Sequence, residues 1–166
     1  GDNCVFVGNH AFAGGGLSLI NSPMAHITNC TFASNTGDSL TGGIFSQTGV
    51  FTMDNCVLWN NSVGGVMNQQ EQISISQQSG PVAVNHCLIQ GLNGSLGGIN
   101  NIDDDPLFAD ADGADNILGT TDDDVHVDGR SPALDAGDVK ALPADVLDID
   151  DDGDLDETLP LDLDNQ

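Results

Sequence analysis

One short motif occurs four times in this chain and decides the fold: Asn3-Cys-Val-Phe6, Asn29-Cys-Thr-Phe32, Asn55-Cys-Val-Leu58 and His86-Cys-Leu-Ile89. The cysteines stand at positions 4, 30, 56 and 87, so the steps between them are 26, 26 and 31 residues. An asparagine follows each motif, and a Gly-Gly pair then precedes an aliphatic residue, as in Gly15-Gly16-Leu17. Self-similarity at a nearly fixed period indicates stacked structural units.

The stretches before the cysteines predict short β-strands. Ala25–Asn29 and Val50–Asn55 alternate apolar and polar residues with a period of two, and no helical period competes with it. Recurrent Asn and Gly suit turns that need a positive φ. We therefore expect an all-β fold, a right-handed parallel β-helix (solenoid) of three to four coils over residues 1–100, with coils about 4.8 Å apart. The five extra residues before Cys87 are expected to form a loop within Asn68–Gly80.

The four cysteines are expected to form a column of buried, reduced thiols. In-register stacking separates neighbouring Cβ atoms by about the coil spacing of 4.8 Å, whereas a disulfide requires roughly 3.8 Å. A zinc site is disfavoured because the chain has no C-x-x-C pair. The histidines, at positions 10, 26, 86 and 126, are scattered and form no catalytic or metal-binding pattern.

The repeats resemble those of a known family. Phe6-Val-Gly-Asn9, Phe32-Ala-Ser-Asn35 and Leu58-Trp-Asn-Asn61 are similar to the FxxN/GGA[ILV] repeats of polymorphic-outer-membrane-protein-like β-helices. The fourth coil departs by one residue, as Ile89-Gln-Gly-Leu-Asn93. The stretch from Asp105 to Asp138 is similar to the C-terminal region of such surface proteins, of the choice-of-anchor Q type. The resemblance implies a right-handed β-helix at the cell surface and says little about molecular activity.

The charge is large and uneven. The chain has 26 acidic residues against Arg130 and Lys140, a net charge of −24. Residues 1–100 hold four of the acids and no base, so residues 101–166 hold 22 acids and both bases. This composition excludes a nucleic-acid binder, which needs a basic surface, and no apolar run is long enough to insert into a membrane. An acidic block of this density is normally disordered unless divalent cations neutralise it.

A calcium-binding loop is predicted near the C-terminus. Asp148-Ile-Asp150-Asp-Asp152-Gly-Asp154-Leu-Asp156 matches the first nine positions of the D-x-D-x-D-G loop. Alternate carboxylates can then point at one Ca²⁺, and the glycine permits the sharp turn. We expect carboxylate ligands from Asp148, Asp150, Asp152 and Asp156, and a backbone carbonyl ligand from Asp154. Position twelve is Leu159, so the last ligand would come from Glu157, Asp162 or Asp164.

A second, less complete acidic cluster precedes this loop. Its candidate calcium ligands are Asp110, Asp112, Asp115, Asp122 and Asp124. The first three are too close in sequence for a full loop, so the stretch Thr121–Asp124 would have to fold back over Gly119. The alternative is a set of capping turns. Magnesium suits both clusters less well, because it rarely occupies all-protein sites.

Residues 101–166 are therefore expected to form an Asp-rich, calcium-binding cap. It would cover the strands and core that a solenoid exposes at its last coil. Pro106-Leu-Phe and Pro132-Ala-Leu would supply buried anchors, and Val125-His-Val127 would form a strand.

We expect an extracellular or cell-surface structural or adhesive protein, or the subunit of a self-assembling filament. The first coil would offer unpaired strands and an apolar section to a head-to-tail second copy or to further coils of a longer β-helix. One alternative is a carbohydrate-active β-helix enzyme. A polysaccharide lyase needs a basic residue, and the only permanent cations are Arg130 and Lys140, whereas a glycoside hydrolase needs only a carboxylate pair. The other alternative is a calcium-dependent glycan-binding module. No residue is assigned a catalytic role.

Overall fold

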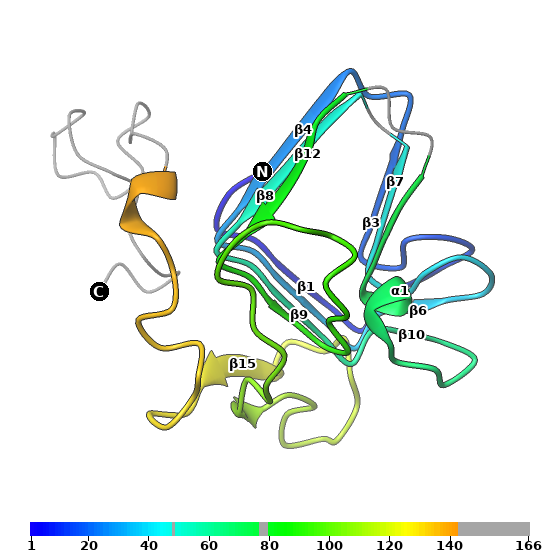
Figure 1. The fold of residues 1–166 in the computed structure, drawn as a ribbon. Coiled ribbons are helices and arrows are strands. Elements are labelled where there is room, and N and C mark those ends of the chain that lie inside the picture. The colour runs from blue at the N-terminus through cyan, green and yellow to red at the C-terminus, as the bar shows by residue number, and fades with distance from the viewer. Residues whose placement is uncertain (48, 77–79, 143–166) are drawn as a thin grey trace, which may run out of the picture.

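The computed structural model describes residues 1–47, 49–76 and 80–142, and its strands stack into a parallel β-solenoid (Figure 1). The first coil contains β1 (Val5–Val7), β2 (His10–Ala11), β3 (Leu17–Ile20) and β4 (Met24–Thr28). The second contains β5 (Thr31–Ala33), β6 (Thr36–Gly37), β7 (Ile44–Gln47) and β8 (Val50–Asp54). The third contains β9 (Val57–Trp59), β10 (Ser62–Val63), α1 (Gln69–Gln72), β11 (Ile73–Ile75) and β12 (Val82–Asn85). A fourth coil begins with β13 (Leu88–Ile89).

Equivalent strands pair in parallel and in register. The sheets are β1-β5-β9-β13, β2-β6-β10, β3-β7-β11 and β4-β8-β12. Val5 pairs with Thr31, Thr31 with Val57, and Val57 with Leu88, so the register follows the repeat of the cysteine motif. This register confirms the predicted stack of coils.

The core lies inside the coils, where one residue of each strand forms a column. The rings of Phe6 and Phe32 stack with centroids 4.7 Å apart and planes 2° from parallel. Leu58 and Ile89 continue the column, and both are fully buried. Their strand neighbours, such as Val5 and Val57, point out of the coil because side chains alternate along a strand.

The cysteines form the expected column, and all four are free thiols. The backbone N–H of Cys30 donates to Cys56 Sγ, and that of Cys56 to Cys87 Sγ, each at 3.4 Å. The hydrogen bond with Cys56 raises the pKa of Cys30, and burial raises the pKa of Cys56, so these thiols stay protonated. Cys4 is exposed, contrary to expectation, because it lies on the open side of the first coil.

The third coil departs from the predicted pattern. Gly64-Gly65 lies in an exposed turn and does not precede a strand. Ile73 pairs with Ile44, 29 positions earlier rather than 26, so three of the five extra residues lie before β11. The other two lie between β11 and β12, since Val82 pairs with Phe51. The segment expected to be a loop, Asn68–Gly80, therefore contains α1 and β11.

The last coil is closed by residues 91–102. Leu92 and Leu96 pack against the core, and Ile102 forms a parallel bridge with Leu88. Gly98 has a φ of +79° and lies directly over the Val84 carbonyl, where a Cβ atom would collide. Gly97-Gly98 thus turns the chain across the end of the core, unlike the earlier Gly-Gly pairs that lead into β3 and β7.

Residues 103–142, here called the flap, lie beside the coils (Figure 1). The flap contains an antiparallel pair, β14 (Phe108–Asp110) and β15 (Asp124–Val127), and a 3₁₀ turn at Val139–Ala141. It starts next to the last coil, and Gly119 then packs against Gly8 of the first. The flap therefore runs along the outer face of the β1-β5-β9-β13 sheet, and the end of the solenoid is covered by residues 91–102.

The outer face of this sheet explains why the flap docks there. Val5, Val57 and Leu88 project outward from it, so these strands are apolar on both faces and require a cover. The predicted strand at 125–127 is confirmed within β15. Pro106 is buried, but Leu134 is 47% exposed and is not the expected anchor.

Candidate functional site

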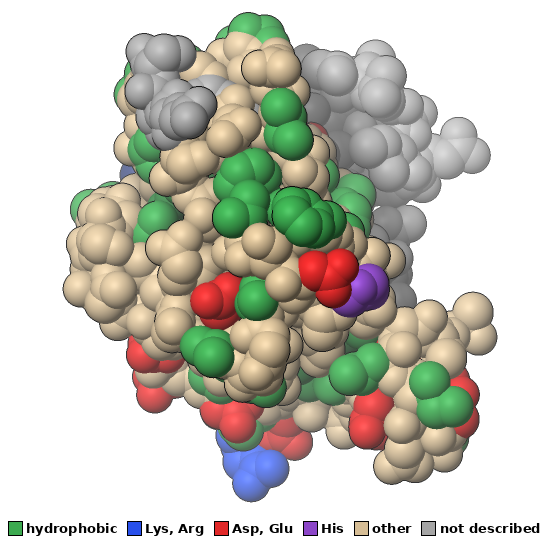
Figure 2. Space-filling model, turned by 90° about the vertical axis from the view of Figure 1, so that its right-hand side faces the viewer, with side chains coloured by type: hydrophobic (Ala, Val, Ile, Leu, Met, Phe, Trp, Pro, Cys, Tyr) green, Lys and Arg blue, Asp and Glu red, His purple; other side chains and the backbone are tan. Residues whose placement is uncertain are grey.

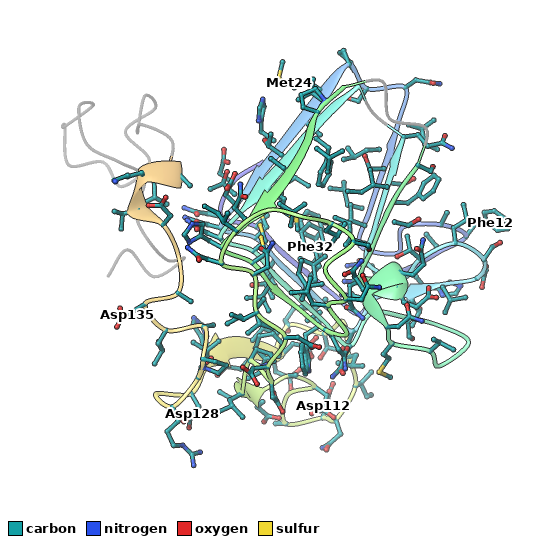
Figure 3. The ribbon with its side chains drawn as sticks, in the orientation of Figure 1. Phe12, Met24, Phe32, Asp112, Asp128 and Asp135 are labelled. Atoms are coloured by element: carbon teal, nitrogen blue, oxygen red, sulfur yellow. The ribbon has the colours of Figure 1, made fainter. Side chains whose placement is uncertain are left out.

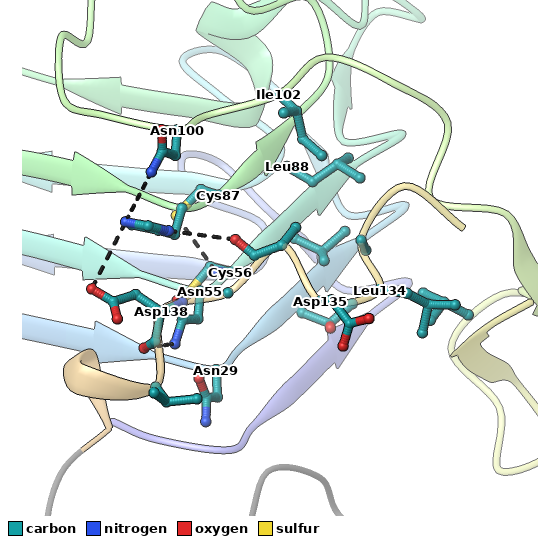
Figure 4. Close-up of a pocket in the computed structure, with 18 of the residues that line it drawn as sticks. Asn29, Asn55, Cys56, Cys87, Leu88, Asn100, Ile102, Leu134, Asp135 and Asp138 are labelled. Atoms are coloured by element: carbon teal, nitrogen blue, oxygen red, sulfur yellow. Dashed lines mark hydrogen bonds and ion pairs between the residues drawn. The ribbon is translucent and has the colours of Figure 1, made fainter. Parts of the chain in front are cut away.

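A pocket of about 570 Å³ lies between the flap and the outer face of the β1-β5-β9-β13 sheet (Figure 4). Its size falls within the range of small-molecule sites. Thr31, Val57 and Leu88 form its sheet wall, and Leu134 and Val139 belong to the opposite wall on the flap.

The polar groups of the pocket gather at one corner of the coils. Asn29, Asn55 and His86 occupy the turn that precedes the cysteine in successive coils, and each has a φ between +52° and +56°. This conformation turns the three side chains toward the flap. His86 has Nε2 3.9 Å from Asp138 Oδ2 and Nδ1 3.4 Å from the Ala136 carbonyl. The sequence carried a signal for this site, because His86 replaces the asparagine of the first three motifs.

The charges in the pocket restrict what it can accept. Two aspartates, Asp135 and Asp138, and two histidines, His86 and His126, are among the residues that line it. No lysine or arginine is among the described residues that line it. The pocket therefore suits a neutral or cationic molecule and disfavours an anionic one.

The predicted calcium ligands Asp148, Asp150, Asp152, Asp154 and Asp156 lie outside the described residues. The second candidate set lies on the flap: Asp110 and Asp124 face each other across the β14–β15 pair. In Figure 3 the flap carries Asp112 and Asp128 well away from the buried Phe32 ring. Within residues 1–47, 49–76 and 80–142, no group of three acidic, His or Cys side chains is arranged to hold a metal ion.

The two halves of this second cluster lie next to each other in the flap. Asp122 packs against Gly113, and Asp122 Oδ2 accepts the Asp115 N–H at 3.2 Å. The Thr120 hydroxyl donates to Asp122 Oδ1 at 2.6 Å and lowers the pKa of that carboxyl, with a further contribution from the Asp115 N–H. In this arrangement the carboxylates accept hydrogen bonds from the loop itself. Calcium binding by this cluster stays a prediction.

His10 and His126 pair with carboxylates on exposed side chains. His10 Nε2 lies 3.2 Å from Asp38 Oδ1, and His126 Nδ1 lies 2.6 Å from Asp124 Oδ1. The backbone N–H of His126 also bonds Asp124 Oδ1 and, with the ring, lowers the pKa of that carboxyl. In the space-filling view, carboxylates gather toward the edge where the flap lies, and the coil surface carries few (Figure 2).

Comparisons with protein-family models, with curated proteins and with solved structures find no match. None of the helices in the described part of the chain has the length and apolar character needed to cross a bilayer.

Proposed function

We propose that this chain is a structural or adhesive protein of the cell surface or extracellular space. Its coils would wind right-handed and form a rigid rod, as in the polymorphic-outer-membrane-protein-like β-helices that its repeats resemble. Its acidic C-terminal region would bind Ca²⁺. The assignment to that family and to an anchored surface protein is part of the proposal.

One observation carries the proposal: the residues that repeat from coil to coil are those that hold the coils together. The inward columns keep their chemistry, as in Asn9, Asn35 and Asn61, which hydrogen-bond from coil to coil. The side chains of the outward columns differ in chemistry from coil to coil. The column that runs through His26, Thr52 and Ala83 is an example. Apart from the asparagines in the positive-φ turns before the cysteines, the repetition lies in the interior, and this pattern supports a scaffold.

Calcium would neutralise the negative charge of the C-terminal region. Twenty-two acids in residues 101–166 repel one another. Ca²⁺ bound by carboxylates would remove much of this repulsion and tie the C-terminal region together.

Surface labelling tests the proposal. An antibody raised against the coils should label intact, unpermeabilised cells that make the protein, and electron micrographs of the native protein should show rods or fibres. Labelling that requires permeabilisation of the cells would contradict a surface location. Compact single particles would contradict a scaffold.

The flap pocket favours a second candidate function, a glycan-binding module or a carbohydrate-active enzyme. Asp135, Asp138 and His86 offer polar groups beside an apolar wall, which suits a neutral sugar better than an anionic one. Calorimetry with neutral and uronate polysaccharides, for the native chain and Asp135→Asn, tests binding. Reducing-end release by the native chain but not by Asp138→Asn would favour a hydrolase.

A further inference from the structure

Two ladders of hydrogen bonds join successive coils, and both have a direction. Asn35 Oδ1 accepts both the backbone N–H and the side-chain Nδ2 of Asn9, at 2.9 and 3.0 Å. Asn61 Oδ1 accepts the same two donors of Asn35, at 3.0 and 2.9 Å. In the cysteine column, the backbone N–H groups of Cys30 and Cys56 likewise donate to the Sγ of the next coil. Every coil thus receives donors from the coil before it.

Both ladders end on side chains of the same chain, the asparagine ladder in the third coil and the cysteine ladder in the fourth. The N–H of Cys87 donates to Asn101 Oδ1 at 3.0 Å, where a further cysteine would otherwise be its acceptor. The N–H and Nδ2 of Asn61 donate to Gln72 Oε1 at 3.2 and 2.8 Å. Leu92 and Leu96 also pack over the core. At this end of the solenoid, the last donors of both ladders are therefore paired and the core is covered.

The first coil has no such termination among the described residues. No described donor reaches Asn9 Oδ1, and no backbone N–H reaches Cys4 Sγ as Cys56 N–H reaches Cys87 Sγ. The N–H of Thr31 donates to the Cys4 carbonyl of the coil before it. Val5 occupies the same register position in β1, so its N–H points out of the stack.

The core is open at the same place. A hollow of about 310 Å³ is bounded by apolar side chains of the first coil, including Phe6, Leu17 and Leu19, and by the Phe32 ring beneath them. Met24, at a corner of the first coil in Figure 3, is 52% exposed. Gly1–Asn3 pair with the C-terminal end of β4, whereas β1 and β3 are the end strands of their sheets. An apolar hollow bordered by such strand edges is a site for β-strand addition.

We propose that the first coil binds one further β-helix coil of the same 26-residue repeat, stacked in parallel on its open side. The asparagine of that coil donates its N–H and Nδ2 to Asn9 Oδ1, and the N–H at its cysteine position donates to Cys4 Sγ. Its inward apolar residues fill the hollow. This inference rests on the proposed structural function and names the partner of its open end.

The contacts favour this occupant over others. All three existing coil junctions share the parallel register of the cysteine motif. The junction between the second and third coils has both ladders, and each of the other two has one of them, so the added coil continues an established interface. An antiparallel strand would not bring an N–H and an Nδ2 of one asparagine to the same acceptor. The far end of a second copy does not fit either, because Asn101 and Gln72 already terminate its ladders. Charge presents no obstacle, because residues 1–100 hold only four acids.

An extended chain tests the inference through the reactivity of Cys4. A copy of residues 1–26 is joined before Gly1, which places its asparagine one repeat before Asn9. Cys4→Ser within the copy leaves the original Cys4 as the reporter. Partial burial raises the pKa of Cys4, so labelling with N-ethylmaleimide is carried out above pH 8 and counted by intact mass. The control is the same extension with Asn9→Ala in the copy.

The parent chain should take up one label rapidly, at the exposed Cys4. In the extended chain the labelling rate should fall at least tenfold, with clearly less protection in the Asn9→Ala control. Unchanged labelling of the extended chain, or equal protection by the control, would overturn the inference. Rapid uptake of three or four labels by the parent would mean that Cys30, Cys56 and Cys87 are not stacked. That result would overturn the proposed scaffold itself.

Discussion

The side-chain amide of Asn55 binds both backbone polar atoms of Asp138. Asn55 Oδ1 accepts the Asp138 N–H at 2.8 Å, and Asn55 Nδ2 donates to the Asp138 carbonyl at 3.1 Å. The two residues are 83 positions apart, so this pair fixes the flap to the second-to-third coil turn. The amide imitates a strand edge, which is possible because the φ of +56° at Asn55 directs its side chain away from the coil.

Asn55→Ala should release the flap while leaving the coils folded. The flap would lose two hydrogen bonds, about 1–3 kcal/mol in total, and its amides should exchange roughly tenfold faster or more. Hydrogen exchange at Asp138 measures this. Asn29→Ala is the control, because it imposes the same positive-φ strain beside the pocket. Equal effects of the two substitutions would assign the change to backbone strain.

Asn35→Ala should be strongly destabilising, because Asn35 is fully buried and exchanges hydrogen bonds with the coils on both sides. Its removal leaves buried donors and acceptors unpaired, at a cost of about 3 kcal/mol. Asn9→Ala, in the exposed first position of the ladder, should cost less than half as much. Urea denaturation compares the two. A similar loss at both positions would show that the ladder does not depend on burial.

Gly98→Ala should prevent normal closure of the last coil. A Cβ atom there meets the Val84 carbonyl, so the substitution should cost at least about 3 kcal/mol. Gly97→Ala carries a similar positive φ with open space around it and should cost only about 1 kcal/mol. Thermal unfolding of both variants compares their losses of stability. Equal losses would mean that residues 91–102 do not pack on the core.

Calcium should stabilise the C-terminal region. At a concentration one hundred times its Kd, Ca²⁺ adds about 2.7 kcal/mol to the state that binds it. Protease resistance of residues 103–166 should therefore rise with Ca²⁺, fall with EDTA and respond weakly to Mg²⁺. The combined variant Asp148→Asn, Asp150→Asn and Asp152→Asn should lose the calcium response. Resistance that persists in excess EDTA argues against a calcium-bound region.

Acidification should loosen the loop around Asp122. The Thr120 hydroxyl and the Asp115 N–H hold the pKa of Asp122 below its ordinary value. A lowered folded-state pKa stabilises the loop above the unfolded-state pKa of about 3.9, and this stabilisation is lost as pH falls through the folded-state pKa. Thr120→Val should raise the pKa of Asp122 in an NMR titration. An unchanged value would mean that the hydroxyl is not the main cause.

Local patterns explain why the coils could be predicted. Side chains along a strand alternate with a period of two, and parallel stacking repeats the register of one coil in the next. Inward residues such as Phe32 and Cys56 can therefore be recognised from the sequence alone. The same reasoning placed the strand at 125–127. It failed at Gly64-Gly65 and Gly97-Gly98, whose sequence matches the other Gly-Gly pairs. Their conformation depends on what lies next to them, which is α1 in one case and the end of the core in the other.

The sequence by itself determined the stack of coils, the register of the cysteine motif from coil to coil and the segregation of charge, because each follows from residue identity at a fixed spacing. Only the tertiary structure decided that the flap lies beside the coils, that Asn55 holds Asp138 and that His86 lines a pocket. These contacts join segments dozens of residues apart, and they form because the β1-β5-β9-β13 sheet is apolar on its outer face and must be covered. The repeat pattern of the sequence does not indicate which segment will cover this face.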